Sequence, residues 1–211
     1  MIFLNKSKKL LKSIENLKKG KVKELVDFRI KEFKNMGKKS NDKLFKELSF
    51  CILTANFNAE RCIDLQNRVG NQLLNSPENE LAQQLTIYGH RFPTVRAKYI
   101  VEARKYKDSL KNIINSENDP REWLIRNVKG IGYKEASHFL RNIGFENYAI
   151  IDFHIIDLLV RYNLIERPKT LTKKKYLEIE QVLNKIAEKT NLNLAQLDLY
   201  LWYLETGKVL K

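Results

Sequence analysis

The chain has 211 residues, 43% of them hydrophobic, and a formal net charge of +14 from 39 basic and 25 acidic side chains. This length allows one or two domains with a substantial core, and the composition is that of an ordinary globular protein. No apolar run approaches the length needed to cross a bilayer, and the apolar part of the N-terminus is too short for a secretory signal, so we expect a cytoplasmic protein.

Positive charge is concentrated towards the N-terminus. The first 50 residues hold 15 basic and 6 acidic side chains, a net of +9. This bias favours a polyanionic partner such as nucleic acid, although solvated helix faces in a lysine-rich proteome are the alternative. The two cysteines, Cys51 and Cys62, are too few for a four-cysteine iron–sulfur or zinc site, and Cys51 is expected in the core. We expect no cofactor and no membrane contact.

Helical periodicity runs along the whole chain, and strand alternation is nearly absent. The sequence therefore predicts an all-α protein of about ten helices. Asn41 and Asp42 are candidate caps of a helix that carries Leu44, Leu48 and Ile52 at helical spacing. The other predicted helical segments, in chain order, are 22–36, 60–74, 95–114, 121–127, 134–142, 152–162, 173–188 and 194–205.

Two of these helices are joined by the short Gly-x-Gly segment 128–134. Asp119 can cap the first of them, with Pro120 in its first turn. Gly130 and Gly132 permit backbone geometry and close approach that other residues resist. Their amides, and those of the following helix N-terminus, would point outward at an anion such as a DNA phosphate. The pattern predicts a helix-hairpin-helix motif, and a tight turn between two helices is the alternative.

Lys134 lies on the first turn of the second hairpin helix, and Asp152 follows eighteen residues later. A neutral amine can attack the anomeric carbon of a nucleoside and form a Schiff base. A carboxylate can stabilise the positive charge that develops on the sugar and assist proton transfer. Taken singly, a helix lysine is usually solvated and an aspartate at a helix start is usually an N-cap. Their joint spacing predicts a site that cuts the glycosidic bond of a flipped base.

With these residues the chain resembles the helix-hairpin-helix DNA glycosylase superfamily, and within it the short archaeal and bacterial class of 8-oxoguanine DNA glycosylase/AP lyase. Segments 51–57, 132–142 and 198–211 carry the likeness. The resemblance implies that Lys134 is the Schiff-base nucleophile and Asp152 the catalytic carboxylate. The enzyme would excise 8-oxoguanine and then nick the strand by β-elimination.

The resemblance also implies a domain organisation. Two helical domains would flank an active-site cleft. Residues 40–146 would form the domain that contains the helix-hairpin-helix, and residues 1–39 and 147–211 would form the second domain.

Contacts with the lesion and the DNA are further implications of the resemblance. Lys211, through its carboxylate, and Trp202, by stacking, would recognise the oxidised base, because a carboxylate pairs with the N7–H of 8-oxoguanine and repels guanine. Asn56 and Phe57 would face the gap left by the flipped base, and Phe92 is a further candidate for contacting the lesion or the DNA. From the residues alone, core packing of Trp202 and a frayed end at Lys211 remain open.

Backbone carbonyls of Arg126, Val128 and Ile131 match positions that often hold a monovalent cation in the superfamily, and such an ion would be structural. The implied partner is double-stranded DNA with 8-oxoguanine or an abasic site, bound by a monomer in a prokaryotic cytoplasm, with the nucleoid. Two alternatives remain: a glycosylase for another damaged base, and a noncatalytic helix-hairpin-helix DNA-binding protein. The binding protein would need neither Lys134 nor Asp152.

Overall fold

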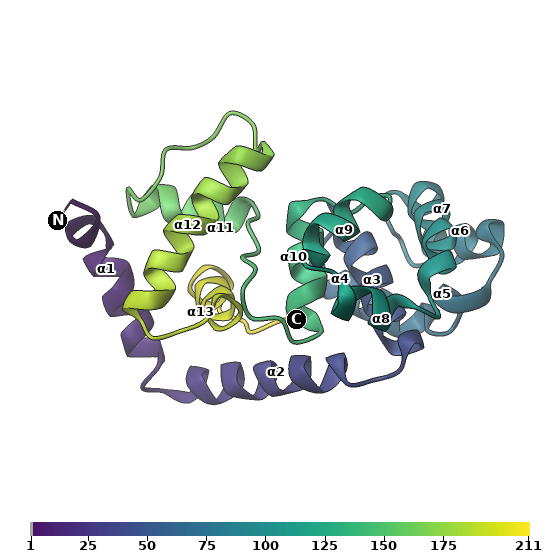
Figure 1. The fold of residues 1–211 in the computed structure, drawn as a ribbon, viewed down its shortest axis with the longest axis horizontal. Helices are drawn as coiled ribbons and strands as arrows, with labels where there is room; N and C mark the ends of the chain where they lie inside the picture. The colour runs from purple at the N-terminus through teal and green to yellow at the C-terminus, as the bar shows by residue number, and fades with distance from the viewer. Residues whose placement is uncertain (1) are drawn as a thin grey trace. The chain divides into compact units, whose positions relative to one another are not determined.

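The computed structural model describes residues 2–211, with side chains from Ser7 onward, and over this range the chain is helical with no strand (Figure 1). This confirms the predicted all-α class. The described elements are α1 Ile2–Leu17, α2 Lys21–Gly37, α3 Asn41–Thr54, α4 Ala59–Val69, α5 Gln72–Asn75, α6 Glu78–Ile87, α7 Pro93–Ala103, the 3-10 helix η1 Arg104–Tyr106, α8 Leu110–Ser116, α9 Pro120–Asn127, α10 Tyr133–Asn142, α11 Phe153–Arg161, α12 Lys173–Lys189 and α13 Leu194–Thr206. Among these helices, none is both long and apolar enough to cross a membrane.

The chain divides into two compact units. The central unit is Asn35–Ile143, and the terminal unit joins the residues up to Lys34 with Gly144–Lys211. The chain therefore leaves the terminal unit once, near the end of α2, and returns to it after α10. The central unit is formed by the residues between these two points.

The core of the central unit is built around α3. Residues 47–54 of this helix are all buried, so the helix is covered on every face. Helices α4, α5, α7, α8 and α10 pack against it. Cys51 lies in this core with no exposed surface, as predicted, and Cys62 is likewise a buried thiol.

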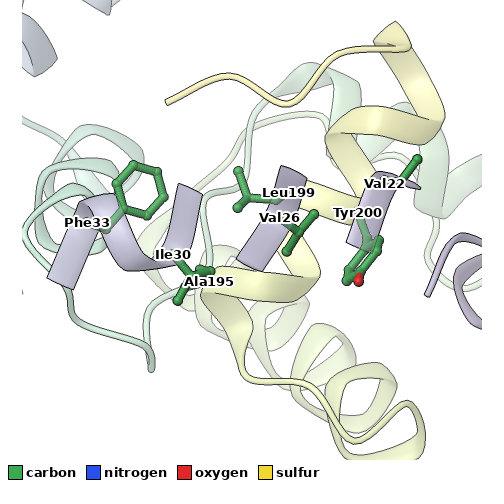
Figure 2. Packing of buried hydrophobic residues seen from close by; sticks show 7 residues of the cluster. All are labelled: Val22, Val26, Ile30, Phe33, Ala195, Leu199 and Tyr200. Atoms are coloured by element: carbon green, nitrogen blue, oxygen red, sulfur yellow. The ribbon is translucent and has the colours of Figure 1, made fainter. Parts of the chain in front are cut away.

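The core of the terminal unit is centred on α13, which packs against α1, α11 and α12. Figure 2 shows a further contact, in which one apolar face of α2 packs against α13. Val22, Val26 and Ile30 recur every four residues and therefore share one side of α2. They meet Tyr200 on α13, where burial raises the pKa of the phenol to about 12.

Two predicted helices are interrupted in the structure. Segment 60–74 is broken into α4 and α5 at Gly70, whose φ of 54° and ψ of −116° end the first helix in a conformation that favours glycine. Segment 95–114 is broken into α7, η1 and α8. At this break the Arg104 guanidinium donates to the carbonyls of Gln72, Leu73 and Ser76.

The N-terminal cap of α3 also differs from the prediction. Ser40 occupies the cap position, so the expectation for Asn41 and Asp42 is wrong. The Asn41 side chain instead joins α3 to the start of α8, accepting from the Lys111 amide at 2.8 Å and donating to the Asp108 carbonyl. A side chain that forms hydrogen bonds with a distant segment is not available to cap its own helix.

Candidate active site

The hairpin connects α9 to α10. Asp119 caps α9, with Oδ1 accepting from the Glu122 amide at 3.1 Å and Pro120 at the first helical position, as predicted. Gly130 has a φ of 82°, and a Cβ added there would lie 2.4 Å from the Tyr99 ring. Only glycine fits this position, because any side chain would be strained by the backbone and would clash with Tyr99.

Gly132 behaves differently from the expectation. Its φ of −105° and ψ of −169° are extended backbone that any residue adopts, so the backbone argument for glycine is wrong here. Its amide donates to Glu135 Oε2 at 3.2 Å, the half of a capping box that an acidic residue at the third helical position supplies. The prediction that this amide points outward at an anion is therefore wrong, because Glu135 accepts from it.

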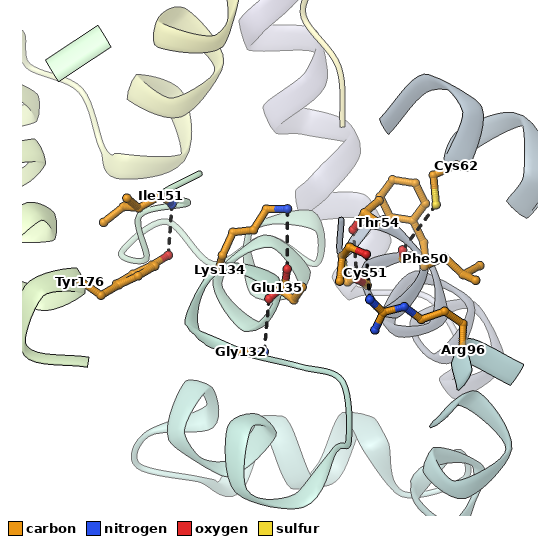
Figure 3. A network of polar contacts seen from close by, with 12 residues as sticks. Phe50, Cys51, Thr54, Cys62, Arg96, Gly132, Lys134, Glu135, Ile151 and Tyr176 are labelled. Atoms are coloured by element: carbon orange, nitrogen blue, oxygen red, sulfur yellow. Dashed lines mark hydrogen bonds and ion pairs between the residues drawn. The ribbon is translucent and has the colours of Figure 1, made fainter. Parts of the chain in front are cut away.

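Lys134 is the second residue of α10, and its Nζ lies 3.7 Å from Glu135 Oε1 (Figure 3). The side chain is partly exposed. At the other end of α10, the buried Asn142 amide donates to Glu47 Oε1 of α3 at 2.7 Å and accepts from Arg141. A buried charged network of this kind fixes the helix on α3, so Lys134 stands on a rigid element.

Arg96 is a buried residue of α7 to which the sequence analysis gave no role. Its Nη2 donates to the Ala55 carbonyl at 2.8 Å, just before Asn56, and Nη1 would lie 3.2 Å from a Cβ on Gly130. Burial lowers the pKa of Arg96, and the Glu135 carboxylate partly offsets this effect. The guanidinium nevertheless stays charged, and it binds the backbone just before Asn56 while lying close to the hairpin at Gly130.

Three predicted DNA-contacting residues lie on two loops of the central unit. Asn56 is exposed and left-handed, with a φ of 59°. Phe57 packs its ring against His90, with centroids 4.4 Å apart, and Phe92 follows two residues later, 37% exposed. The structure therefore brings these loops together. Arginines accompany both: Arg61 lies over Phe57 and Arg91 over Phe92.

Asp152 belongs to the terminal unit and caps α11, with Oδ1 accepting from the Ile155 amide at 3.0 Å. The three residues before it, 149–151, are buried but not helical, so their backbone groups need partners. The Tyr176 hydroxyl donates to the Ala149 carbonyl at 2.7 Å and accepts from the Ile151 amide at 3.2 Å. Glu180 accepts from the Ala149 amide at 2.9 Å. Side chains of α12 thus hold the backbone that leads into Asp152.

Trp202 is joined to the start of α11 by aromatic contacts. Its ring meets His154 edge-on, with centroids 4.9 Å apart and planes at 84°, and His154 stacks on Phe153 at 3.9 Å. The buried Trp202 Nε1–H has no hydrogen-bond partner among the described residues, which is unusual for a buried indole. Simple core packing therefore does not account for Trp202. Phe153, which is 64% exposed, lies beside these predicted site residues and was missed by the sequence analysis.

The tail after α13 is docked on the terminal unit. Gly207 ends α13 in a left-handed conformation, and Val209 packs against the α2–α13 cluster. Arg29 of α2 donates to the Val209 carbonyl at 3.5 Å, and Lys211 is partly buried. These contacts argue against the alternative that the C-terminal end is frayed.

The predicted site residues fall into two sets. The central unit holds Lys134, Gly130, Gly132, Asn56, Phe57 and Phe92, and the terminal unit holds Asp152, Trp202 and Lys211. Of the three carbonyls expected to bind a monovalent cation, that of Val128 accepts from the Ile131 amide at 3.4 Å. The cation and the roles of all these residues stay predictions.

The fold and the hairpin define a structural class. The chain is similar to endonuclease III in a noncovalent complex with DNA, with a TM-score of 0.56 and 18% identity over 86% of this chain and 85% of the other. At this identity the likeness shows the fold alone, which is that of the helix-hairpin-helix glycosylases.

Closer comparisons show the family. The 8-oxoguanine DNA glycosylase family matches residues 26–192. An 8-oxoguanine DNA glycosylase/AP lyase of Methanocaldococcus jannaschii is 55% identical over 206 residues, which are 96% of this chain and 99% of the relative. A crystal structure of the glycosylase/lyase of that organism with a 15mer DNA containing 8-oxoguanine matches with a TM-score of 0.93 and 54% identity, over 96% and 99% of the two chains. The chain belongs to the 8-oxoguanine DNA glycosylase family.

Proposed function

We propose that this protein is a bifunctional 8-oxoguanine DNA glycosylase/AP lyase that works on double-stranded DNA. The observation that carries the proposal is a lysine on the first turn of the hairpin helix, in a chain 55% identical to a relative named for this activity over nearly the full length of both. The charge of +14 suits a DNA partner. Because its substrate is chromosomal DNA, the protein works in the cytoplasm, with the nucleoid.

Lys134 acts as the nucleophile. Its neutral Nζ forms a bond to C1′ while the glycosidic bond breaks, and the departing base takes a proton. Opening of the sugar gives a Schiff base. Loss of a C2′ proton then expels the 3′ phosphate, which nicks the strand, and water releases Lys134. Asp152 stabilises the cationic sugar and carries protons between these steps, through the carboxylate oxygen that does not cap α11.

Recognition of the lesion and the DNA uses the remaining residues. Trp202 stacks on the flipped base. Phe92 and Lys211 contact the same base. Asn56 offers a donor and an acceptor to the orphaned opposite base, and Phe57 fills the gap in the stack. The hairpin at Gly130 positions a phosphate.

A lesion panel tests the proposal. Duplexes that each contain one 8-oxoguanine, one 3-methyladenine or only normal bases are incubated with native protein and with Lys134→Gln. We expect excision and nicking only at 8-oxoguanine, and neither with the variant. Excision of 3-methyladenine alone would assign another substrate, and binding of every duplex without cleavage would indicate a DNA-binding protein with no catalysis.

A further inference from the structure

The mechanism above gives no role to His90, a side chain that contacts three segments of the central unit. It is 5% exposed and lies between the end of α6 and the start of α7. Its Nε2 is 3.0 Å from the Leu53 carbonyl at the end of α3, and its Nδ1 accepts from the Phe92 amide at 3.0 Å. Its ring packs against Phe57. One side chain therefore holds both loops on which DNA-contacting residues were predicted.

The hydrogen bonds determine where the imidazole carries its proton. A backbone amide can only donate, so Nδ1 must present a lone pair to Phe92. A carbonyl can only accept, so Nε2 must carry the hydrogen that points at Leu53. A second proton on Nδ1 would face the Phe92 N–H, and that hydrogen bond would be lost.

The surroundings of His90 disfavour a second proton. Burial lowers the pKa of His90, the Leu53 carbonyl opposes this effect, and the positive charge of Arg96 on α7 adds to it. Two further arginines are close to His90: Arg61 of α4 lies over Phe57 and near Gly89, and Arg91 is the next residue in the chain. The arrangement is therefore still complete at the ordinary pKa of histidine, near 6.5, and is lost only at a lower pH, as His90 takes up a second proton.

We propose that His90 is a positioning residue, which holds Phe92 in place for base excision as a neutral imidazole with its proton on Nε2. The proposal rests on the function proposed above, because Phe92 matters only where a flipped base is present. At an abasic site there is no base to contact. Loss of the Phe92 bond therefore slows excision of 8-oxoguanine more than nicking of a preformed abasic site.

A matched pair of variants separates the two hydrogen bonds. The side-chain amide of His90→Asn reaches the place of Nδ1 and still accepts from Phe92, whereas that of His90→Gln reaches the place of Nε2 and still donates to Leu53. Both lose the ring contact with Phe57. We expect His90→Gln to lower single-turnover excision about tenfold while nicking of abasic duplex changes less than about threefold, and His90→Asn to keep most of the excision rate. Ser49→Ala, which removes another buried hydrogen bond of α3, should alter neither reaction by more than about twofold.

The native protein should show the same split when it is acidified. Its ratio of excision to nicking should hold at pH 6.5 and fall only at a lower pH, because the pKa of His90 is lowered, whereas that of His90→Asn should stay flat. Nitrogen NMR of the native imidazole should find Nδ1 unprotonated at neutral pH. Equal losses in the two variants, excision and nicking that fall together, or a protonated Nδ1 would overturn the proposal. A native protein that excises nothing but keeps this tautomer would instead refute the proposed function.

Discussion

The hydroxyl of Tyr176 accepts a hydrogen bond from the amide of Ile151, one residue before Asp152. The same hydroxyl donates to the Ala149 carbonyl, so both of its hydrogen-bonding roles serve the nonhelical segment that leads into α11. Tyr176 and Glu180 are one helical turn apart on α12 and therefore reach this segment from the same face. Helix α12, which begins about twenty residues later in the chain, thus holds the backbone that precedes Asp152 at the start of α11.

Tyr176→Phe removes the hydroxyl and leaves a buried carbonyl and a buried amide without this partner. We expect a loss of about 1–3 kcal/mol in the free energy of unfolding. We also expect the single-turnover excision rate to fall about tenfold, because the Asp152 carboxylate is no longer held in one geometry. Affinity for duplex DNA should stay unchanged. Urea unfolding and single-turnover kinetics measure the two effects.

Thr190→Val is the matched control for this experiment. Thr190 is buried at the other end of α12, where its hydroxyl donates to the Ile186 carbonyl at 2.8 Å. This variant should be less stable but should excise at the native rate. If the two variants lose rate in proportion to their loss of stability, Tyr176 has a structural role only.

Asp152 has two roles that different substitutions separate. Asn retains an oxygen that can accept from the Ile155 amide, so Asp152→Asn should keep the cap and the native stability. It should nevertheless lower the excision rate about 10²–10⁴-fold, because the carboxylate is lost. Asp152→Ala should lose the rate and about 1 kcal/mol of stability together. Calorimetry and kinetics on both variants check this, and an active Asn variant would remove Asp152 from the mechanism.

Gly130→Ala should be the most damaging glycine substitution in the hairpin. The left-handed backbone and the contact with Tyr99 together should cost at least about 1–3 kcal/mol in the free energy of unfolding. Gly132→Ala should cost less, because its backbone is extended and a Cβ would meet only the end of the Glu135 side chain. Gly20→Ala, with open space around it, is the control. Similar losses at Gly130 and Gly20 in urea unfolding would contradict this account of the turn.

Binding to undamaged duplex should weaken steeply as salt is raised, because phosphate contacts release counterions. Lys129 of the hairpin is an exposed cation whose Nζ lies 2.9 Å from Glu102. Lys129→Gln should reduce the slope of log affinity against log salt by about 0.9 if this lysine contacts a phosphate. Fluorescence anisotropy over a salt series measures both slopes. A flat response of the native protein would contradict a phosphate-binding hairpin.

Local signals in the sequence predicted several features that the structure confirms. The cap at Asp119 and the need for glycine at Gly130 depend on local backbone geometry, as does the N-cap that was the alternative interpretation of Asp152. Helical periodicity likewise gave the all-α class. The same reasoning failed at Asn41, where the side chain binds residues about 70 positions away and leaves the cap to Ser40.

The sequence analysis missed other features of the site, one of them local and the rest dependent on distant contacts. The Gly132 amide is taken by Glu135, a capping residue that the sequence analysis could have found as an acid three positions beyond the cap. Arg96, His90 and Tyr176 act through hydrogen bonds to backbone groups of distant segments. The residues next to them in the sequence do not indicate these roles, because the sequence does not distinguish one buried polar side chain from another.

The most direct test of the central claim is borohydride trapping on a duplex with one 8-oxoguanine, followed by peptide mapping. Native protein, Lys134→Gln and Lys129→Gln are compared, since the second lysine lies in the same hairpin but outside the proposed chemistry. We expect a covalent adduct at Lys134 in the native protein and in Lys129→Gln, and none in Lys134→Gln. An adduct that persists without Lys134, or excision by the native protein with no adduct, would contradict the assignment of Lys134 as the nucleophile.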